Sequence, residues 1–108
     1  MSDAGTEPFD LPIDTKDPHK PIITIVIISF KPYVYAVTFR AFIDGQNRDI
    51  RRWDNVNKPD HMDIFHLRKP ERKHLKSSLG KVRKTSDLQK IVIHIFENWR
   101  KYVKQYQQ

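Results

Sequence analysis

Residues 51–66, RRWDNVNKPDHMDIFH, place a high density of titratable side chains around one turn. Metal-independent cleavage of RNA needs a base for the 2′-hydroxyl proton, an acid for the leaving 5′-oxygen and a cation for the charged phosphate. Histidine near neutral pH can perform either proton transfer, and arginine can bind phosphate with two parallel hydrogen bonds. The types and spacing of these residues therefore indicate a candidate catalytic site.

Each residue of this candidate site has a predicted role. His61 is the general acid or base, and His66 is the second proton-transfer candidate. Arg52 or Arg51 binds the phosphate, and Asp54 orients or pairs with one of these groups. The predicted mechanism uses no metal and no other cofactor.

Two other interpretations of the same segment stay open. His61, Asp63 and His66 could ligate a divalent metal, although their spacing matches no known closed site. Alternatively, Asp–Arg pairs stabilise an exposed hairpin, and the histidines are ordinary surface residues. Residue pattern alone does not decide between these interpretations.

Short antiparallel strands are predicted to position the segment. The stretch IITIVIISF is apolar and β-branched, as expected of a central strand, and Asp44-Gly45 is a strong signal for a tight hairpin turn. Because every connection is short, the expected topology is an antiparallel meander. The predicted strands are 22–30, 33–43, 47–55 and 61–68.

Period-2 alternation along the strands assigns the candidate residues to faces of the sheet. Arg52 and Asp54 are predicted to share a face of the third strand. His61 and Asp63 share a face of the fourth, whereas a regular strand points His66 to the opposite side. Only a bulge would re-aim one of the two histidines.

One long helix is predicted to close the chain. Apolar residues recur at three- and four-residue steps from Leu88 to Tyr106, and Ser86 with Gln89 has capping-box spacing. Residues 1–20 contain three prolines and five acidic residues and are predicted to be a flexible, irregular arm. The predicted fold is an α+β domain over residues 21–108, with a four-stranded antiparallel meander and one C-terminal helix packed on one face.

Composition narrows the class of protein further. The 108 residues include no cysteine, which excludes disulfides, thiolate metal sites and a cysteine nucleophile. No apolar run approaches the roughly 20 residues of a membrane span, so no membrane partner is expected. The acidic, polar start MSDAGTEPFD is unlike a secretory signal, which leads to the expectation of a cytoplasmic protein.

Positive charge is concentrated after the N-terminal arm. Beyond residue 20 the chain has eighteen Lys or Arg against eight acidic residues, and the densest segment is RKPERKHLKSSLGKVRK, residues 68–84. Such a charge excess favours a polyanion through long-range attraction and counterion release. We therefore predict that residues 68–84 form a loop that holds an RNA backbone. The predicted nucleic-acid contacts are Arg51, Trp53, Lys58, Arg68, Lys69, Arg72, Lys73, Lys76, Lys81, Arg83 and Lys84.

Two motifs carry a resemblance to a known family. R-W-D-N-V-N-K-P-D-H (52–61), followed by D-L-x-K-I-V-x-H-I-F-E-N-W (87–99), resembles the TumE-type toxin family of toxin–antitoxin systems. The resemblance covers residues 22–103. The residues that fall on the family's pattern are Trp53, Asp54, Asn55, Asp60 and His61. The family usually has a further histidine where this chain has Asp63, which weakens a mechanism based on two neighbouring histidines.

The resemblance implies a growth-arresting endoribonuclease paired with a small antitoxin protein encoded nearby. Together with the charge distribution, it leads to the prediction of an RNA-acting, toxin-like protein, a metal-independent endoribonuclease. The alternative is a non-catalytic module with a basic surface that binds nucleic acid or a protein partner. RNA sequence preference, antitoxin identity and oligomeric state are left open.

Overall fold

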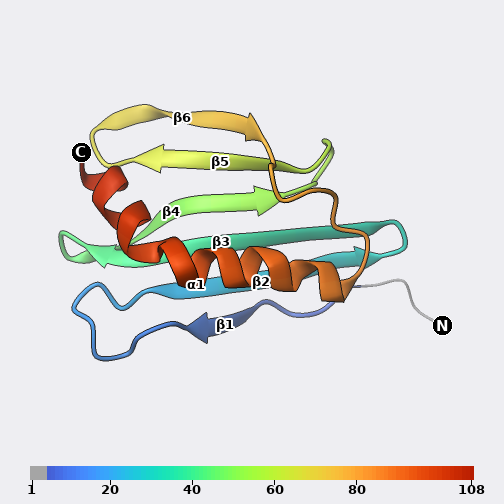
Figure 1. Cartoon of the computed structure of the whole chain (residues 1–108), viewed down its shortest axis with the longest axis horizontal. Coiled ribbons are helices and arrows are strands. Elements are labelled where there is room, and N and C mark those ends of the chain that lie inside the picture. The colour runs from blue at the N-terminus through green and yellow to red at the C-terminus, as the bar shows by residue number, and fades with distance from the viewer. Residues whose placement is uncertain (1–4) are drawn as a thin grey trace.

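The computed structural model describes residues 5–108, with the side chains of residues 70–72 left out of the description. Six antiparallel strands form one sheet in which spatial order follows chain order, and helix α1 (Thr85–Gln107) lies across one face of it (Figure 1). The strands are β1 (Phe9–Pro12), β2 (Ile22–Phe30), β3 (Tyr33–Ile43), β4 (Gln46–Asp54), β5 (His61–His66) and β6 (Lys69–Lys76). The predictions of an α+β fold and of a C-terminal helix packed on an antiparallel meander are confirmed.

The predicted number of four strands is wrong, because both edges of the sheet carry one strand more. β1 forms inside the segment predicted to be an irregular arm, and it pairs with the first residues of β2. β6 forms inside the segment predicted to be a basic loop, and it pairs with β5. Both are edge strands, which are short or rich in charge in many proteins, so they lack the apolar signal of a central strand.

The turn between β3 and β4 has the backbone geometry that its sequence predicts. Asp44 and Gly45 both have positive φ, 52° and 80°. Two successive positive φ values are characteristic of the hairpin turn that matches the twist of the flanking strands. The alternation expected along β3 and β4 therefore starts from a well-defined register, with Ile43 opposite Gln46.

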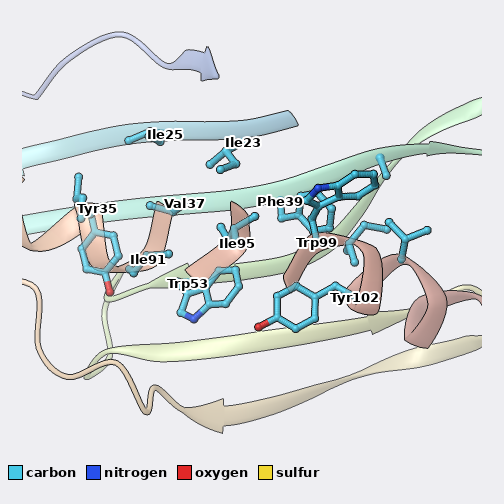
Figure 2. Packing of buried hydrophobic residues seen from close by; sticks show 14 of the residues in the cluster. Ile23, Ile25, Tyr35, Val37, Phe39, Trp53, Ile91, Ile95, Trp99 and Tyr102 are labelled. Atoms are coloured by element: carbon cyan, nitrogen blue, oxygen red, sulfur yellow. The ribbon is translucent and has the colours of Figure 1, made fainter. Parts of the chain in front are cut away.

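The hydrophobic core lies between α1 and one face of the sheet (Figure 2). Trp53 of β4 and Phe39 of β3 both pack against Tyr102 of the helix. Ile91 and Ile95, one turn apart on α1, are fully buried on the same side. This packing assigns one face of every central strand to the core. Among the described residues, no helix has the length and apolar character needed to cross a membrane.

Candidate active site

The register of β4, β5 and β6 brings four titratable residues together. Asp54 lies opposite His61, and Asp63 lies opposite His74 of β6. Directly opposed residues in neighbouring strands project from the same face of a sheet. Trp53, which alternates with Asp54, points into the core, so this group lies on the face of the sheet away from α1. We call Asp54, His61, Asp63 and His74 the His–Asp cluster.

His61 is the most enclosed histidine of the cluster, with 6% of its surface exposed. Its Nδ1 lies 3.0 Å from the backbone oxygen of Pro59, which can only accept, so Nδ1 carries a proton. Its Nε2 lies 3.3 Å from Asp54 Oδ1 and 3.9 Å from an oxygen of Asp63. Both ring nitrogens thus face protein groups, and His61 holds the two carboxylates in place.

His74 is the accessible histidine of the cluster. Its Nδ1 donates to Asp63 Oδ1 at 2.5 Å, while 41% of its side chain is exposed. The other ring nitrogen, Nε2, is therefore free of this hydrogen bond. The imidazole also lies against the ring of His61, with centroids 4.1 Å apart. A buried carboxylate that orients an exposed imidazole is the arrangement of a general base.

Asp54 is fixed at the end of β4 by three contacts. Arg52 Nε donates to its Oδ2 at 2.9 Å, and the backbone N–H of Val56 donates to its Oδ1 at 3.0 Å. The third contact is with His61. The carboxylate is nearly buried, whereas 39% of the Arg52 side chain is exposed. Arg52 therefore keeps part of its guanidinium available to an anion.

The cluster lines a surface hollow of about 270 Å³, whose rim includes Arg52 and Lys58. A second hollow, of about 470 Å³, shares Lys58 and is also lined by Tyr33, Lys81 and Arg83. We call this second one the basic hollow. Because Lys58 belongs to both, the two hollows adjoin, and a bound strand could pass from one to the other.

His66 and Arg51 lie on the face of the sheet opposite to the His–Asp cluster. Together with Gln105 of α1 they line a different hollow. Arg51 donates to Gln105 at 2.6 Å and stacks over the ring of Tyr102, and its burial lowers the pKa of its guanidinium. The bulge after Ile64 does not bring the two predicted catalytic histidines together. His61 and His66 therefore cannot share one bound phosphate.

Trp53 was predicted to contact nucleic acid, but it is 1% exposed. Its ring packs against Tyr102 and lies edge-on to His94. A base cannot stack on a ring that is enclosed by the core. Trp53 is therefore a core residue in this structure.

The other predicted nucleic-acid contacts are mostly at the surface. They border the β5–β6 edge of the sheet and the segment that leads into α1. The side chain of Arg72 lies outside the described residues. The exposed members are Lys58, Arg68, Lys69, Lys73, Lys76, Lys81, Arg83 and Lys84.

Two residues of the motif at 52–61, Asn55 and Asp60, hold the backbone in place. The side chain of Asn55 accepts from the backbone of Tyr35 and donates to that of Tyr33, which fixes the start of β3. Asp60 accepts from the Tyr35 hydroxyl at 2.7 Å and from the backbone of Val82. Burial, followed by this bond to Asp60, raises the pKa of the Tyr35 phenol far above its usual value. The motif thus builds the β4–β5 connection that supports the cluster.

Sequence reasoning missed His74, because it lies in the segment predicted to be a loop. The sequence offered no strand signal there, because residues 69–76 have polar side chains on both faces and Leu75 as their one aliphatic residue. The structure also changes the set of potential metal ligands. His61, Asp63 and His74 each offer a ligand atom, and these atoms lie within 4.8 Å of one another. His66 is not in this set.

Fold and cluster together define an α+β protein with a meander sheet that carries a histidine–aspartate site on its open face. The chain belongs to the family of a domain of unknown function, DUF7718, whose model matches residues 15–108. That range contains β2 to β6 and α1, and therefore the whole cluster. No curated protein and no solved structure matches the chain. The resemblance to TumE-type toxins stays a prediction.

Proposed function

We propose that the protein is a metal-independent endoribonuclease that acts as the toxin of a toxin–antitoxin pair. The observation that carries the catalytic part is the exposed His74 imidazole, which the buried Asp63 carboxylate holds in a hollow rimmed by cations. The toxin part is supported by the resemblance of the motifs at 52–61 and 87–99. The basic surface around the hollow supports RNA as the substrate.

The reaction that suits this arrangement is transfer of the phosphate to the neighbouring 2′-oxygen. His74 Nε2 takes the proton of the 2′-hydroxyl, and the 2′-oxygen attacks the adjacent phosphorus. The bond to the 5′-oxygen breaks, and this oxygen takes a proton from the Lys58 ammonium. The products are a 2′,3′-cyclic phosphate and a 5′-hydroxyl.

The cations of the hollow stabilise the charge that develops on the phosphate. Arg52 is already oriented by Asp54 through its Nε, so its other guanidinium nitrogens are available to phosphate oxygens. The proposal gives His61 a positioning task, since its nitrogens face Pro59, Asp54 and Asp63. His74 therefore replaces His61 as the proposed proton-transfer residue.

The basic hollow is the proposed path of the RNA strand. Lys81 and Arg83 line it together with Tyr33, whose ring is half-buried. Lysine and arginine hold the backbone, and an aromatic ring offers a stacking surface to a base. Lys58 then leads the strand into the hollow of the cluster.

The test of the proposal is cleavage of an RNA oligonucleotide by the purified chain in the presence of a chelator. The expected products end in a 2′,3′-cyclic phosphate, and the same oligonucleotide with 2′-deoxyribose throughout stays intact. His74→Ala should reduce the cleavage rate by about 10²–10⁴-fold, because it removes the base but no buried group. His66→Ala is the matched control on the opposite face and should cleave like the parent chain.

Other results would point to the alternative. RNA binding by the parent chain without any cleavage would favour a non-catalytic module with a basic surface. Cleavage that His74→Ala leaves unchanged would place the chemistry outside the cluster. For the toxin part, induced expression in bacteria should arrest growth, and the His74→Ala chain should not; unimpeded growth with the parent chain would contradict it.

A further inference from the structure

We propose that the His–Asp cluster also binds one divalent transition-metal ion, with His61 Nε2, the Asp63 carboxylate and His74 Nδ1 as ligands. These three groups come from two neighbouring strands, β5 and β6, and their ligand atoms lie within 4.8 Å of one another. Asp54 lies beside them and offers a carboxylate oxygen as a fourth donor. The site differs from the metal set that the sequence suggested, because His74 takes the place of His66.

The distances are close to those of a coordination sphere. In a tetrahedral zinc site with bonds of 2.0–2.1 Å, neighbouring ligand atoms lie about 3.3 Å apart. His61 Nε2 is 3.3 Å from Asp54 Oδ1 and 3.9 Å from Asp63 Oδ2. The contact between His74 Nδ1 and Asp63 Oδ1 is 2.5 Å, so these two atoms have to move apart to about 3.3 Å when the ion binds. His74 can make this adjustment, since its side chain is exposed on an edge strand.

The groups behind the ligands have the pattern that orients metal ligands. The Nδ1–H of His61 donates to the Pro59 carbonyl, so Nε2, which faces Asp54 and Asp63, is the nitrogen left for an ion. A metal-binding histidine usually donates its other ring N–H to a carbonyl or carboxylate. Asp54 is held in the same way by Arg52 and by the backbone of Val56. The cluster is therefore oriented before any ion arrives.

The donor atoms indicate the class of ion. Two imidazole nitrogens with one or two carboxylates suit zinc, nickel, cobalt or copper, whereas calcium and magnesium prefer oxygen ligands alone. Arg52 and Lys58 on the rim reduce the attraction for a cation, so binding depends on the imidazoles and not on net charge. We choose Zn²⁺ as the probe.

A bound ion would change both the chemistry and the mechanics of the site. The ion would bind Nδ1 of His74 in place of a proton. Asp63 could then no longer accept a hydrogen bond from Nδ1, and it would no longer orient the ring as a base. This consequence rests on the proposed function, whereas metal binding itself does not. The ion would also link β5 to the edge strand β6, which stabilises the folded state.

The first measurement is calorimetric titration of the chelator-treated chain with Zn²⁺ alone. The expected result is one ion per chain. The affinity of His74→Ala for Zn²⁺ should be more than about tenfold lower, because one of the direct ligands is lost. His66→Ala should bind like the parent. The melting temperature should rise with Zn²⁺ in the parent and in His66→Ala, but not in His74→Ala. Absence of binding, or equal binding by all three chains, would overturn the proposed site.

RNA cleavage separates this inference from the proposed function. Cleavage that Zn²⁺ inhibits in proportion to site occupancy supports both. Cleavage that requires Zn²⁺ supports the metal site and overturns the metal-independent reaction. Zn²⁺ binding by a chain that cleaves RNA under no condition leaves the metal site standing and overturns the endoribonuclease. If the cleavage rate does not change when Zn²⁺ saturates the site, then the ion does not inhibit the reaction and His74 is not the catalytic base.

Discussion

Two histidines in contact can serve different purposes when one is buried and the other is exposed. Both ring nitrogens of His61 contact protein groups, and the buried ring helps to fix the positions of Asp54 and Asp63. His74 donates one hydrogen bond to Asp63, through Nδ1, and its side chain is partly exposed to solvent. The buried residue gives the site its geometry, and the exposed one presents Nε2, the atom for which we propose a catalytic role. A substitution at His61 would therefore disturb fold and chemistry together, whereas His74 allows chemistry to be tested alone.

A third histidine, His94 of α1, is predicted to make folding stability depend on pH. Its ring accepts a hydrogen bond from the Tyr102 hydroxyl and lies edge-on to Trp53. Burial, and then the positive charge of Arg51, lowers its pKa. A lowered pKa in the folded state favours the neutral form, so the contribution of His94 is present above the unfolded value of about 6.5. It is lost as the pH falls through the lowered value.

Urea unfolding at a series of pH values checks this prediction. Below about pH 6.5, the free energy of unfolding of the parent chain should fall more steeply than that of His94→Gln, which cannot be protonated. Other titrating groups contribute to both chains, so the difference between the two slopes is the informative quantity. Identical slopes would show that His94 is as easily protonated in the folded state as in the unfolded one.

At the scale of elements, the prediction from sequence succeeded where the strand signal was strong. Alternation placed Arg52 with Asp54, and His61 with Asp63, on common faces, as the register of β4 and β5 shows. It failed at β6, because KPERKHLK has one aliphatic residue that a buried face could use. An edge strand is specified by its pairing with a neighbour, which local propensity does not report. The predicted site did not include His74 because β6 was not predicted to be a strand.

The basic residues of β6 and the segment after it are predicted to set the salt dependence of RNA binding. Lys73, Lys76, Lys81 and Lys84 are exposed. If each contacts a phosphate, changing all four to Gln should weaken binding for all RNA sequences alike. The slope of log affinity against log salt should fall by roughly 0.7 for each lost contact with a single strand. Fluorescence anisotropy over a range of salt concentrations gives this slope.

A matched variant controls for net charge. Lys31, Lys90, Lys101 and Lys104 are also exposed, and three of them belong to α1. Changing these four to Gln removes the same charge and should leave the salt slope close to that of the parent. Equal slopes for the two quadruple variants would mean that the β6 segment has no special place in binding.

For the whole molecule, the hydrophobic core and the proposed site lie on opposite faces of the sheet. α1 and the core residues of β2, β3 and β4 occupy one face (Figures 1 and 2). The register of β4 and β5 places the His–Asp cluster on the other face. Ile95 is fully buried on the helix side. Ile95→Ala should lower the free energy of unfolding by about 2–5 kcal/mol, through lost burial and the cavity that remains.

The same variant should keep the activity proposed for the cluster. Its cleavage rate per folded molecule should equal that of the parent, because Ile95 lies on the helix side of the sheet and the cluster lies on the other face. Chemical denaturation gives the stability, and cleavage at a temperature where the variant is fully folded gives the rate. A slower reaction in the fully folded variant would show that packing on the helix face is transmitted through the sheet to the cluster.

The succession of β4, β5 and β6 along the chain also has a genetic consequence. Residues 52–74 contain the entire His–Asp cluster, so the site lies within one continuous segment of the chain. A codon added in the β5–β6 turn, at residues 67–68, lengthens that turn and leaves the strands in phase. A codon added inside β5, between His61 and Asp63, reverses the face of every side chain on one side of the insertion. Small insertions should therefore be tolerated in the β5–β6 turn, and they should destroy the site when they fall within β5 or in the β4–β5 connection, whose backbone holds Asp54 and His61.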